Sequence, residues 1–187
     1  MAKFLIAAYP TQLLNGEEVD EKACALRFGE ITSDSQVYAA ERLFTEYLQT
    51  HKDESDSPIP ILRYRIDFRA GVLDILGLPA WMGVSHGCDN PLWWYKEKVG
   101  GWKEGQLDVL NEWLKPLVYF VNGDDAGQVA KEWYATTPDE ASAGAGKGMQ
   151  RPVRVFKQDC SIAVEEDSRW EAKMPIMEVM RQARQQT

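Results

Sequence analysis

Apolar residues recur at helical spacing between residues 37 and 48 and leave the charged residues on the other faces. The apolar positions are Val37, Ala40, Leu43, Phe44, Tyr47 and Leu48. Ser33 and Gln36 stand before them at the spacing of a capping box, in which side chains satisfy the free N–H groups of the first turn. We therefore predict an amphipathic helix that begins near Ser33 and ends near His51.

Residues 60–68, PILRYRIDF, have a different periodicity. The apolar positions Leu62, Tyr64, Ile66 and Phe68 alternate with charged ones. Because successive side chains of a strand point to opposite faces, this pattern is typical of a half-buried β-strand. The acidic, Ser-rich residues 51–60 before it contain two prolines and predict a solvated loop in which His51 is a plain surface residue.

Further along the chain, the pattern predicts a long helix over residues 106–121. Its apolar positions Leu107, Leu110, Leu114, Leu117, Val118 and Val121 are expected to face inward. Asn122-Gly123 predicts its end, and Pro116 would kink it. A short helix is expected at 128–134.

The last part of the chain predicts a loop, a hairpin and a helix. Residues 139–151 are small and polar and predict a flexible loop. The runs VRVFK and SIAVEED predict two strands that turn at Gln158-Asp159, and an amphipathic helix follows from near Arg169.

Composition indicates a soluble globular protein with a substantial core. The chain has 187 residues, of which 44% are hydrophobic, and seven are Trp. We therefore expect one domain over residues 1–187. A net charge of −8 argues against nucleic acid and against an anionic membrane surface as partners, since both attract basic patches.

The three cysteines predict neither a disulfide framework nor a metal site. Cys24, Cys88 and Cys160 are odd in number and widely spaced, which favours a reducing compartment. The apolar run in residues 1–10 is too short for a signal peptide or a membrane span. We expect a cytoplasmic protein with no metal.

Two motifs invite a functional interpretation that their surroundings do not support. AGAGKGM at 143–149 resembles a phosphate-binding loop, but Lys147 precedes Gly rather than Ser or Thr.

GVSHG at 83–87 matches the G-x-S-x-G elbow and would make Ser85 a nucleophile. An elbow needs a strand before it and a helix after it. Its base histidine also comes later in the chain than the serine, whereas His51, the only histidine besides His86, comes earlier than Ser85. An independent Ser85 esterase stays an alternative.

His86 is the strongest candidate for catalysis. It lies in a Gly- and Trp-rich stretch after the predicted strand, with Asp89 close behind it. Such a setting favours a general base, although a lone loop histidine is more often structural. On the residues alone, both interpretations stay open.

Four segments together resemble the closing part of type-B carboxylesterases, the cholinesterase-like group, and especially its fungal members. They are PILRYRIDF, GLPAWMGVSHGCDNPLWW, WLKPLVYFVNGDD and VRVFKQDCSIAVEEDSRWE, in this order. The resemblance covers nearly the whole chain. It implies an α/β class, namely the C-terminal portion of an α/β-hydrolase fold with a terminal β-hairpin and helix. It also implies that His86 is the histidine of a Ser-Glu-His triad and that Asp89 falls on the acidic position after it.

The same resemblance implies that the nucleophile elbow, the oxyanion loop and the triad acid belong before this sequence. The implied function is hydrolysis of a small-molecule ester without a cofactor, with this chain inactive by itself. Its substrate-binding residues cannot be mapped, because the pocket walls belong mostly to the other part. One alternative is a non-catalytic binding protein that uses Trp81, Trp93 and Trp94. Another is a chain that pairs with a separate N-terminal half.

Overall fold

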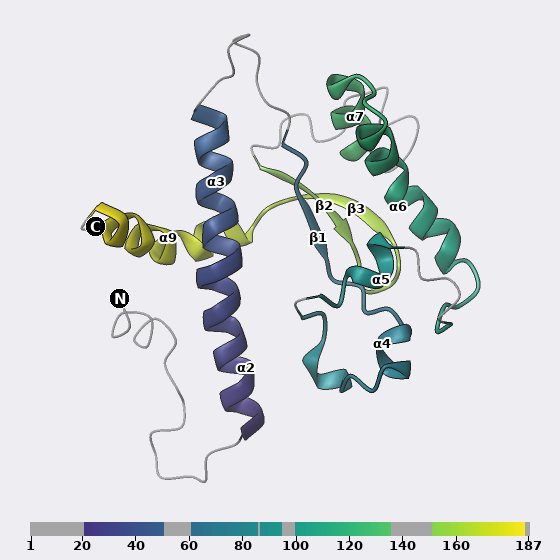
Figure 1. Cartoon of the computed structure of the whole chain (residues 1–187), viewed down its shortest axis with the longest axis horizontal. Coiled ribbons are helices and arrows are strands. Elements are labelled where there is room, and N and C mark those ends of the chain that lie inside the picture. Colours follow the sequence, from purple (N-terminus) through teal and green to yellow (C-terminus); the bar gives the residue numbers. More distant parts are fainter. Residues whose placement is uncertain (1–20, 51–60, 86, 95–99, 136–150, 186–187) are drawn as a thin grey trace. The chain divides into compact units, whose positions relative to one another are not determined.

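The computed structural model describes residues 21–50, 61–85, 87–94, 100–135 and 151–185 (Figure 1). The chain divides into two compact units, one of Met1–Ile59 with Ser168–Thr187 and one of Pro60–Asp167. The single partial domain over 1–187 stays a prediction, and the loop predicted at 139–151 lies, up to residue 150, outside the described residues. None of the described helices has the length and apolar character needed to cross a membrane.

The first unit contains a long helical run and the last helix of the chain. The run comprises α2 (Glu21–Thr32), a π-helical segment η1 (Ser33–Tyr38) and α3 (Ala39–Thr50). The predicted helix start near Ser33 is therefore wrong. Thr32 keeps helical dihedral angles and makes no side-chain cap, while the Ser35 hydroxyl donates to the carbonyl of Ile31 at 2.7 Å. Serine here bonds back into a helix that continues through it.

The helix α9 (Arg169–Gln185), which the sequence predicts, packs against α3. Ala39, Trp170, Ile176 and Met177 form their buried core. The apolar face predicted for residues 37–48 is largely wrong, since Val37, Phe44 and Tyr47 are each at least half exposed. The buried positions of α3 are instead Ala39, Arg42 and Thr45. The guanidinium of Arg42 lies 5.4 Å from the Trp170 ring centroid.

The second unit is built on a three-stranded mixed sheet in the order β1-β2-β3. β1 (Tyr64–Ile66) runs parallel to β2 (Pro152–Phe156), which forms an antiparallel hairpin with β3 (Ile162–Glu166). The short helices α4 (Val72–Ile75), η2 (Ala80–Met82) and α5 (Asn90–Trp93) precede the longer α6 (Gln106–Val121) and α7 (Ala126–Trp133). The helices, the mixed sheet, the hairpin and the last helix confirm the α/β class and are compatible with part of a larger α/β fold.

β1 is shorter than the predicted strand over 60–68. Directly before it, the amide of Arg63 donates to the Tyr134 hydroxyl at 3.1 Å, and the Arg63 carbonyl accepts both the Arg154 amide at 3.1 Å and the Trp133 indole at 2.9 Å. The predicted alternation is also only partly right. Phe68 is buried, but Tyr64 is 47% exposed and Arg63 is buried in an ion pair with Asp167.

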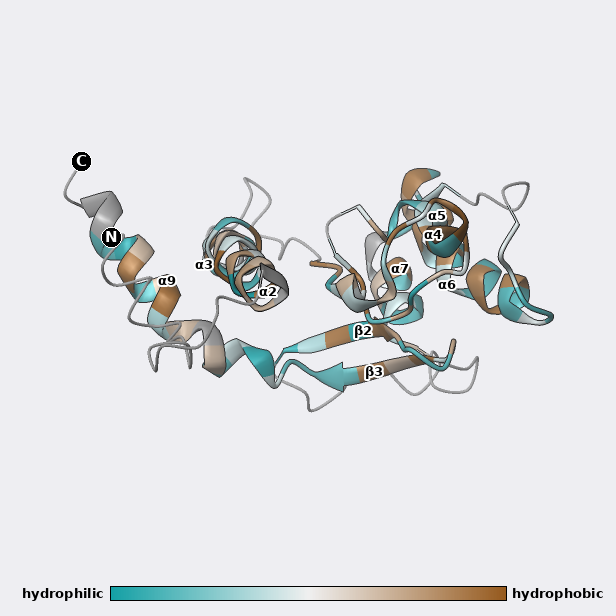
Figure 2. Cartoon of the chain, turned by 90° about the horizontal axis from the view of Figure 1, so that it is seen from below, coloured by the Kyte–Doolittle hydropathy of each residue, from teal (hydrophilic) through white to brown (hydrophobic). Residues whose placement is uncertain are grey.

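The core of this unit lies between the sheet, α6 and the loop after β1. Its buried members are Phe68, Ala70, Val72, Leu73, Cys88, Leu92, Leu110, Trp113 and Phe156. Trp113 stacks on Phe156 with ring centroids 5.3 Å apart. Of the positions predicted to face inward on α6, Val118 and Val121 are exposed, and Figure 2 shows hydrophobic and hydrophilic residues together along this helix. Pro116 is buried inside α6.

Candidate functional site

The loop after β1, residues 67–94, begins at a point fixed to the sheet. The amides of Asp67 and Phe68 both donate to the carbonyl of Phe156, at 2.8 and 3.1 Å. The Phe68 ring packs against Phe156 and stacks near Trp102. The first residues of the loop are therefore held by a buried aromatic anchor.

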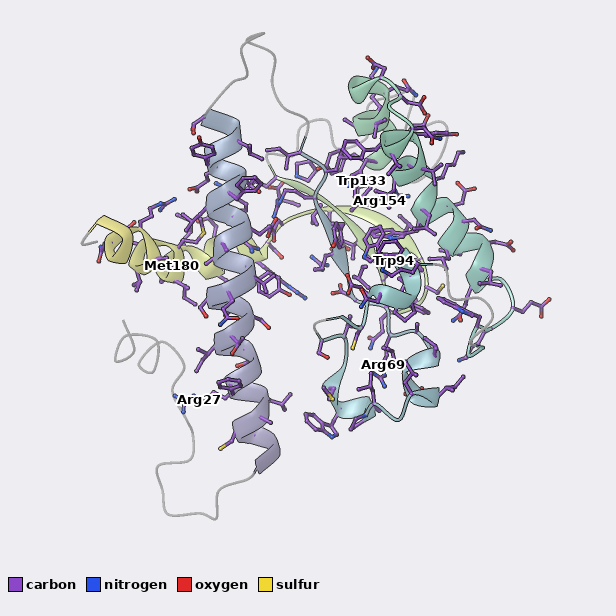
Figure 3. All side chains as sticks on the ribbon, in the orientation of Figure 1. Arg27, Arg69, Trp94, Trp133, Arg154 and Met180 are labelled. Carbon is purple, nitrogen blue, oxygen red and sulfur yellow. The ribbon has the colours of Figure 1, made fainter. Side chains whose placement is uncertain are left out.

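Arg69 extends from this anchor and ties together distant parts of the loop (Figure 3). Its Nη1 donates to the carbonyl of Gly83 at 2.9 Å. Its Nη2 donates to the carbonyl of Leu78 at 2.7 Å and to a carboxylate oxygen of Asp74 at 2.8 Å. The guanidinium fork suits this task, because its fixed donors can serve several acceptors at once.

His86 lies outside the described residues, so its catalytic role stays a prediction. The residues on both sides of it are described. Gly83 and Gly87 adopt positive φ angles of 58° and 78°, which favour glycine. The Ser85 carbonyl accepts the Cys88 amide at 3.0 Å. Cys88 is only 3% exposed and belongs to the core.

Ser85 does not stand in the local structure of a nucleophile elbow. The 3-10 helix η2 precedes it, and a turn followed by the four-residue α5 comes after it. Its Oγ lies 3.2 Å from the Sγ of the buried Cys88. An elbow places its serine between a strand and a helix, so the local structure argues against Ser85 as the nucleophile.

Asp89 makes a bond within its own helix. A carboxylate oxygen of Asp89 accepts from the Trp93 indole at 3.0 Å, and its carbonyl accepts the Leu92 amide at 2.9 Å. These bonds close α5 and place Trp93 4.8 Å from the Tyr64 ring, centroid to centroid. Whether Asp89 also supports His86 stays a prediction.

The three tryptophans of the predicted binding surface have different surroundings. Trp93 belongs to an aromatic cluster with Tyr64, Trp113 and Trp133. Trp81 and Trp94, by contrast, are 45% and 74% exposed. Within the described part of the chain, no group of three or more His, Cys, Asp or Glu side chains could hold a metal ion.

Arg154 completes the aromatic cluster from β2, and the sequence analysis missed it. Its guanidinium carbon lies 5.0 Å from the Trp113 ring centroid and 5.4 Å from that of Trp133. Burial lowers the pKa of Arg154 to about 10, although the charge of Glu112 opposes that shift. The group stays charged at neutral pH. The available signal was an arginine between two valines of an apolar strand.

Arg69 was missed as well. It stands between the apolar Phe68 and Ala70, directly before a Gly- and Pro-rich loop, and this placement was the signal. A charged residue between two core residues at the start of an irregular loop has many unpaired carbonyls within reach.

Comparison with known proteins gives one relative. The chain is 28% identical over 174 residues to an uncharacterized esterase/lipase of Schizosaccharomyces pombe. The similarity covers 91% of this chain but 28% of the yeast protein, so the chain spans less than a third of that relative's length. No family model matches the chain. No solved structure matches it either.

Proposed function

We propose that this chain is the histidine-bearing, C-terminal part of an ester hydrolase of the type-B carboxylesterase kind, with His86 as its general base. The observation that carries the proposal is the similarity to an esterase/lipase along 91% of the chain. The four segments that resemble the closing part of type-B carboxylesterases support the finer assignment.

The proposed reaction is acyl transfer through a covalent intermediate. A serine outside this chain attacks the ester carbonyl while His86 takes its proton and gives it to the leaving alcohol, which leaves an acyl-serine. Water, deprotonated by His86, then attacks the acyl-serine, and the acid leaves as the proton returns to the serine. A glutamate, also outside this chain, orients the imidazole. The substrate is a small-molecule ester, and no cofactor takes part. Without the nucleophile and the oxyanion hole, the 187 residues alone have no turnover.

The two histidines of the chain supply a test with an internal control. In the native gene product, His86→Ala lowers the kcat for p-nitrophenyl acetate about a thousandfold or more, because the serine loses its base. His51→Ala, in the predicted solvated loop, leaves kcat unchanged. Full hydrolysis by His86→Ala would contradict the proposal.

Labelling with a fluorophosphonate separates this proposal from an independent Ser85 esterase. The reagent forms a covalent adduct with an activated serine. We expect the adduct on a serine outside residues 1–187. An adduct on Ser85 would instead identify the G-x-S-x-G motif as the nucleophile site.

The exposure of Trp81 and Trp94 favours a second candidate function, a non-catalytic binding protein derived from the esterase fold. Large exposed aromatic side chains commonly mark binding surfaces. A native product that binds an apolar ester and shows no turnover, with or without His86, would favour this second candidate.

A further inference from the structure

Arg69 holds Gly83, which precedes His86 by three residues. The structure describes a bond from the Arg69 Nη1 to the Gly83 carbonyl, and Gly83 itself has no side chain that could pack into the core. The segment from residue 77 to 85 contains one 3-10 turn, η2, and no strand. A backbone of this kind is held by whatever bonds its carbonyls accept.

The base of Arg69 is rigid, whereas the segment that it holds is irregular. Phe68 and Ala70 on either side are buried, at 3% and 0% exposure. The side chain of Arg69 is only 15% exposed, and its bonds to the two carbonyls are partly buried, whereas its bond to Asp74 is exposed. Because one guanidinium donates to both Leu78 and Gly83, the two carbonyls keep a fixed spacing across η2.

The far side of position 86 has a separate anchor. Cys88 and Leu92 are buried in the core, and the Gly87 carbonyl accepts the Asn90 amide at 3.2 Å. Removal of Arg69 would therefore free the backbone at Gly83, before His86, and leave the backbone from Cys88 to Leu92, after His86, in place.

We propose that Arg69 is a positioning residue that fixes the backbone on the N-terminal side of His86 and thereby aligns the imidazole for proton transfer. The inference rests on the proposed role of His86. Proton transfer depends on hydrogen-bond distance and direction, and a misplacement of about 1 Å can cost about a hundredfold in rate.

Arg65 provides a matched control. It lies in β1, four residues before Arg69, and its side chain is 17% exposed, close to the 15% of Arg69. The structure shows it bonded to the carboxylates of Asp67 and Glu165, at 3.0 and 2.9 Å, and to no carbonyl of the 77–85 segment. Arg65→Met therefore removes ion pairs of a similarly buried arginine without removing a bond to the 77–85 segment.

The first experiment measures kinetics in the native gene product. We expect Arg69→Met to lower kcat for p-nitrophenyl acetate about a hundredfold while KM changes less than about threefold, because alignment and not binding is lost. Arg65→Met keeps kcat within about threefold. Arg69→Lys keeps the cation but not the fork and falls in between. Added guanidinium ion should restore part of the kcat that Arg69→Ala loses and should leave the kcat of Arg65→Ala unchanged.

The second experiment follows the loop itself and works without turnover. Amide hydrogen exchange in the native gene product, followed by mass spectrometry of its peptides, should speed up at Val84 and Ser85 in Arg69→Met, while Val155 and Ala163 of the hairpin keep their protection. In Arg65→Met, Val84 and Ser85 should exchange at the original rates. Equal effects of the two variants on this segment would overturn the proposal, and so would full kcat in Arg69→Met.

The two proposals fail in different ways. Full hydrolysis by His86→Ala removes the proposed function and this inference with it. An inactive His86→Ala together with a fully active Arg69→Met keeps the proposed function and overturns the role of Arg69.

Discussion

Gly100 and Gly101 share a backbone conformation but have different surroundings. Their φ angles are +82° and +81°, in the region that favours glycine. A Cβ on Gly101 would lie 2.5 Å from the Val72 amide nitrogen and 2.6 Å from the Gly71 carbonyl carbon. A Cβ on Gly100 would meet a methyl group of Ile75 at 3.7 Å, an ordinary contact. The Gly71–Gly101 approach thus joins the start of α4 to the segment before α6.

We expect the two alanine substitutions at these positions to separate conformational strain from steric overlap. Gly100→Ala lowers the free energy of unfolding by about 1 kcal/mol, the cost of a side chain in the left-handed region. Gly101→Ala costs about 3 kcal/mol, because two backbones must also move apart. Urea unfolding followed by Trp fluorescence measures both. Equal losses in the free energy of unfolding would mean that the close approach of Gly71 and Gly101 adds nothing to the cost of the Gly101 substitution.

The bonds that organise the loop could not be predicted from the sequence, although the position of Arg69 could have marked it as a candidate. The partners of Arg69 are backbone carbonyls 9 and 14 positions away, and no side-chain pattern marks them. Arg154 has the same kind of partner on α6. His86 was proposed only because the segments around it resemble a known family.

Pro116 leaves a gap in the hydrogen bonding of α6, and Arg154 supplies the missing donor. Proline has no N–H, so the carbonyl of Glu112, one turn earlier, lacks its usual helical partner. The Arg154 Nη2 donates to this carbonyl at 2.8 Å, and its Nη1 donates to the next carbonyl, that of Trp113, at 3.2 Å. Trp113 and Trp133 contact the same guanidinium through their rings. A strand side chain therefore stabilises a helix that contains an internal proline.

A double-mutant cycle tests this pairing. Arg154→Met lowers the free energy of unfolding by about 2 kcal/mol, since the partly buried Glu112 carbonyl loses its donor and two rings lose a cation. In a Pro116→Ala background the same change costs about 1 kcal/mol less, because the new amide can reach the Glu112 carbonyl.

The matched control for this cycle is Pro175→Ala, which removes the proline inside α9. It should leave the cost of Arg154→Met unchanged, because the carbonyls that Arg154 binds are those of Glu112 and Trp113 in α6, whereas Pro175 belongs to another helix in the other compact unit. A Pro116→Ala background that behaves like the Pro175→Ala background would contradict the pairing.

Elements with a clear local period were predicted well, and the others were not. The helix over 106–121, the hairpin and the helix from Arg169 were found within a few residues of their bounds. The sequence analysis missed α2, because Cys24, Leu26 and Phe28 recur every second residue and mark no helical face. The buried face of α3 was wrong because an arginine packs on Trp170 where the pattern offered aliphatic residues.

At the scale of the whole molecule, the described sheet has the form expected of part of a larger one. β1 lies at the edge of a parallel pair, and in the described residues its other side has no strand partner. Parallel strands are usually covered on both faces and continued by further strands. The similarity to 28% of a longer esterase/lipase agrees with this form.

The intact mass of the native gene product, captured with an antibody against this chain and labelled with a fluorophosphonate, tests the central claim most directly. The account predicts one polypeptide, much heavier than the 21.2 kDa of these 187 residues, that contains this sequence and carries the label on a serine outside it. An unlabelled product of 187 residues with no labelled partner would contradict it.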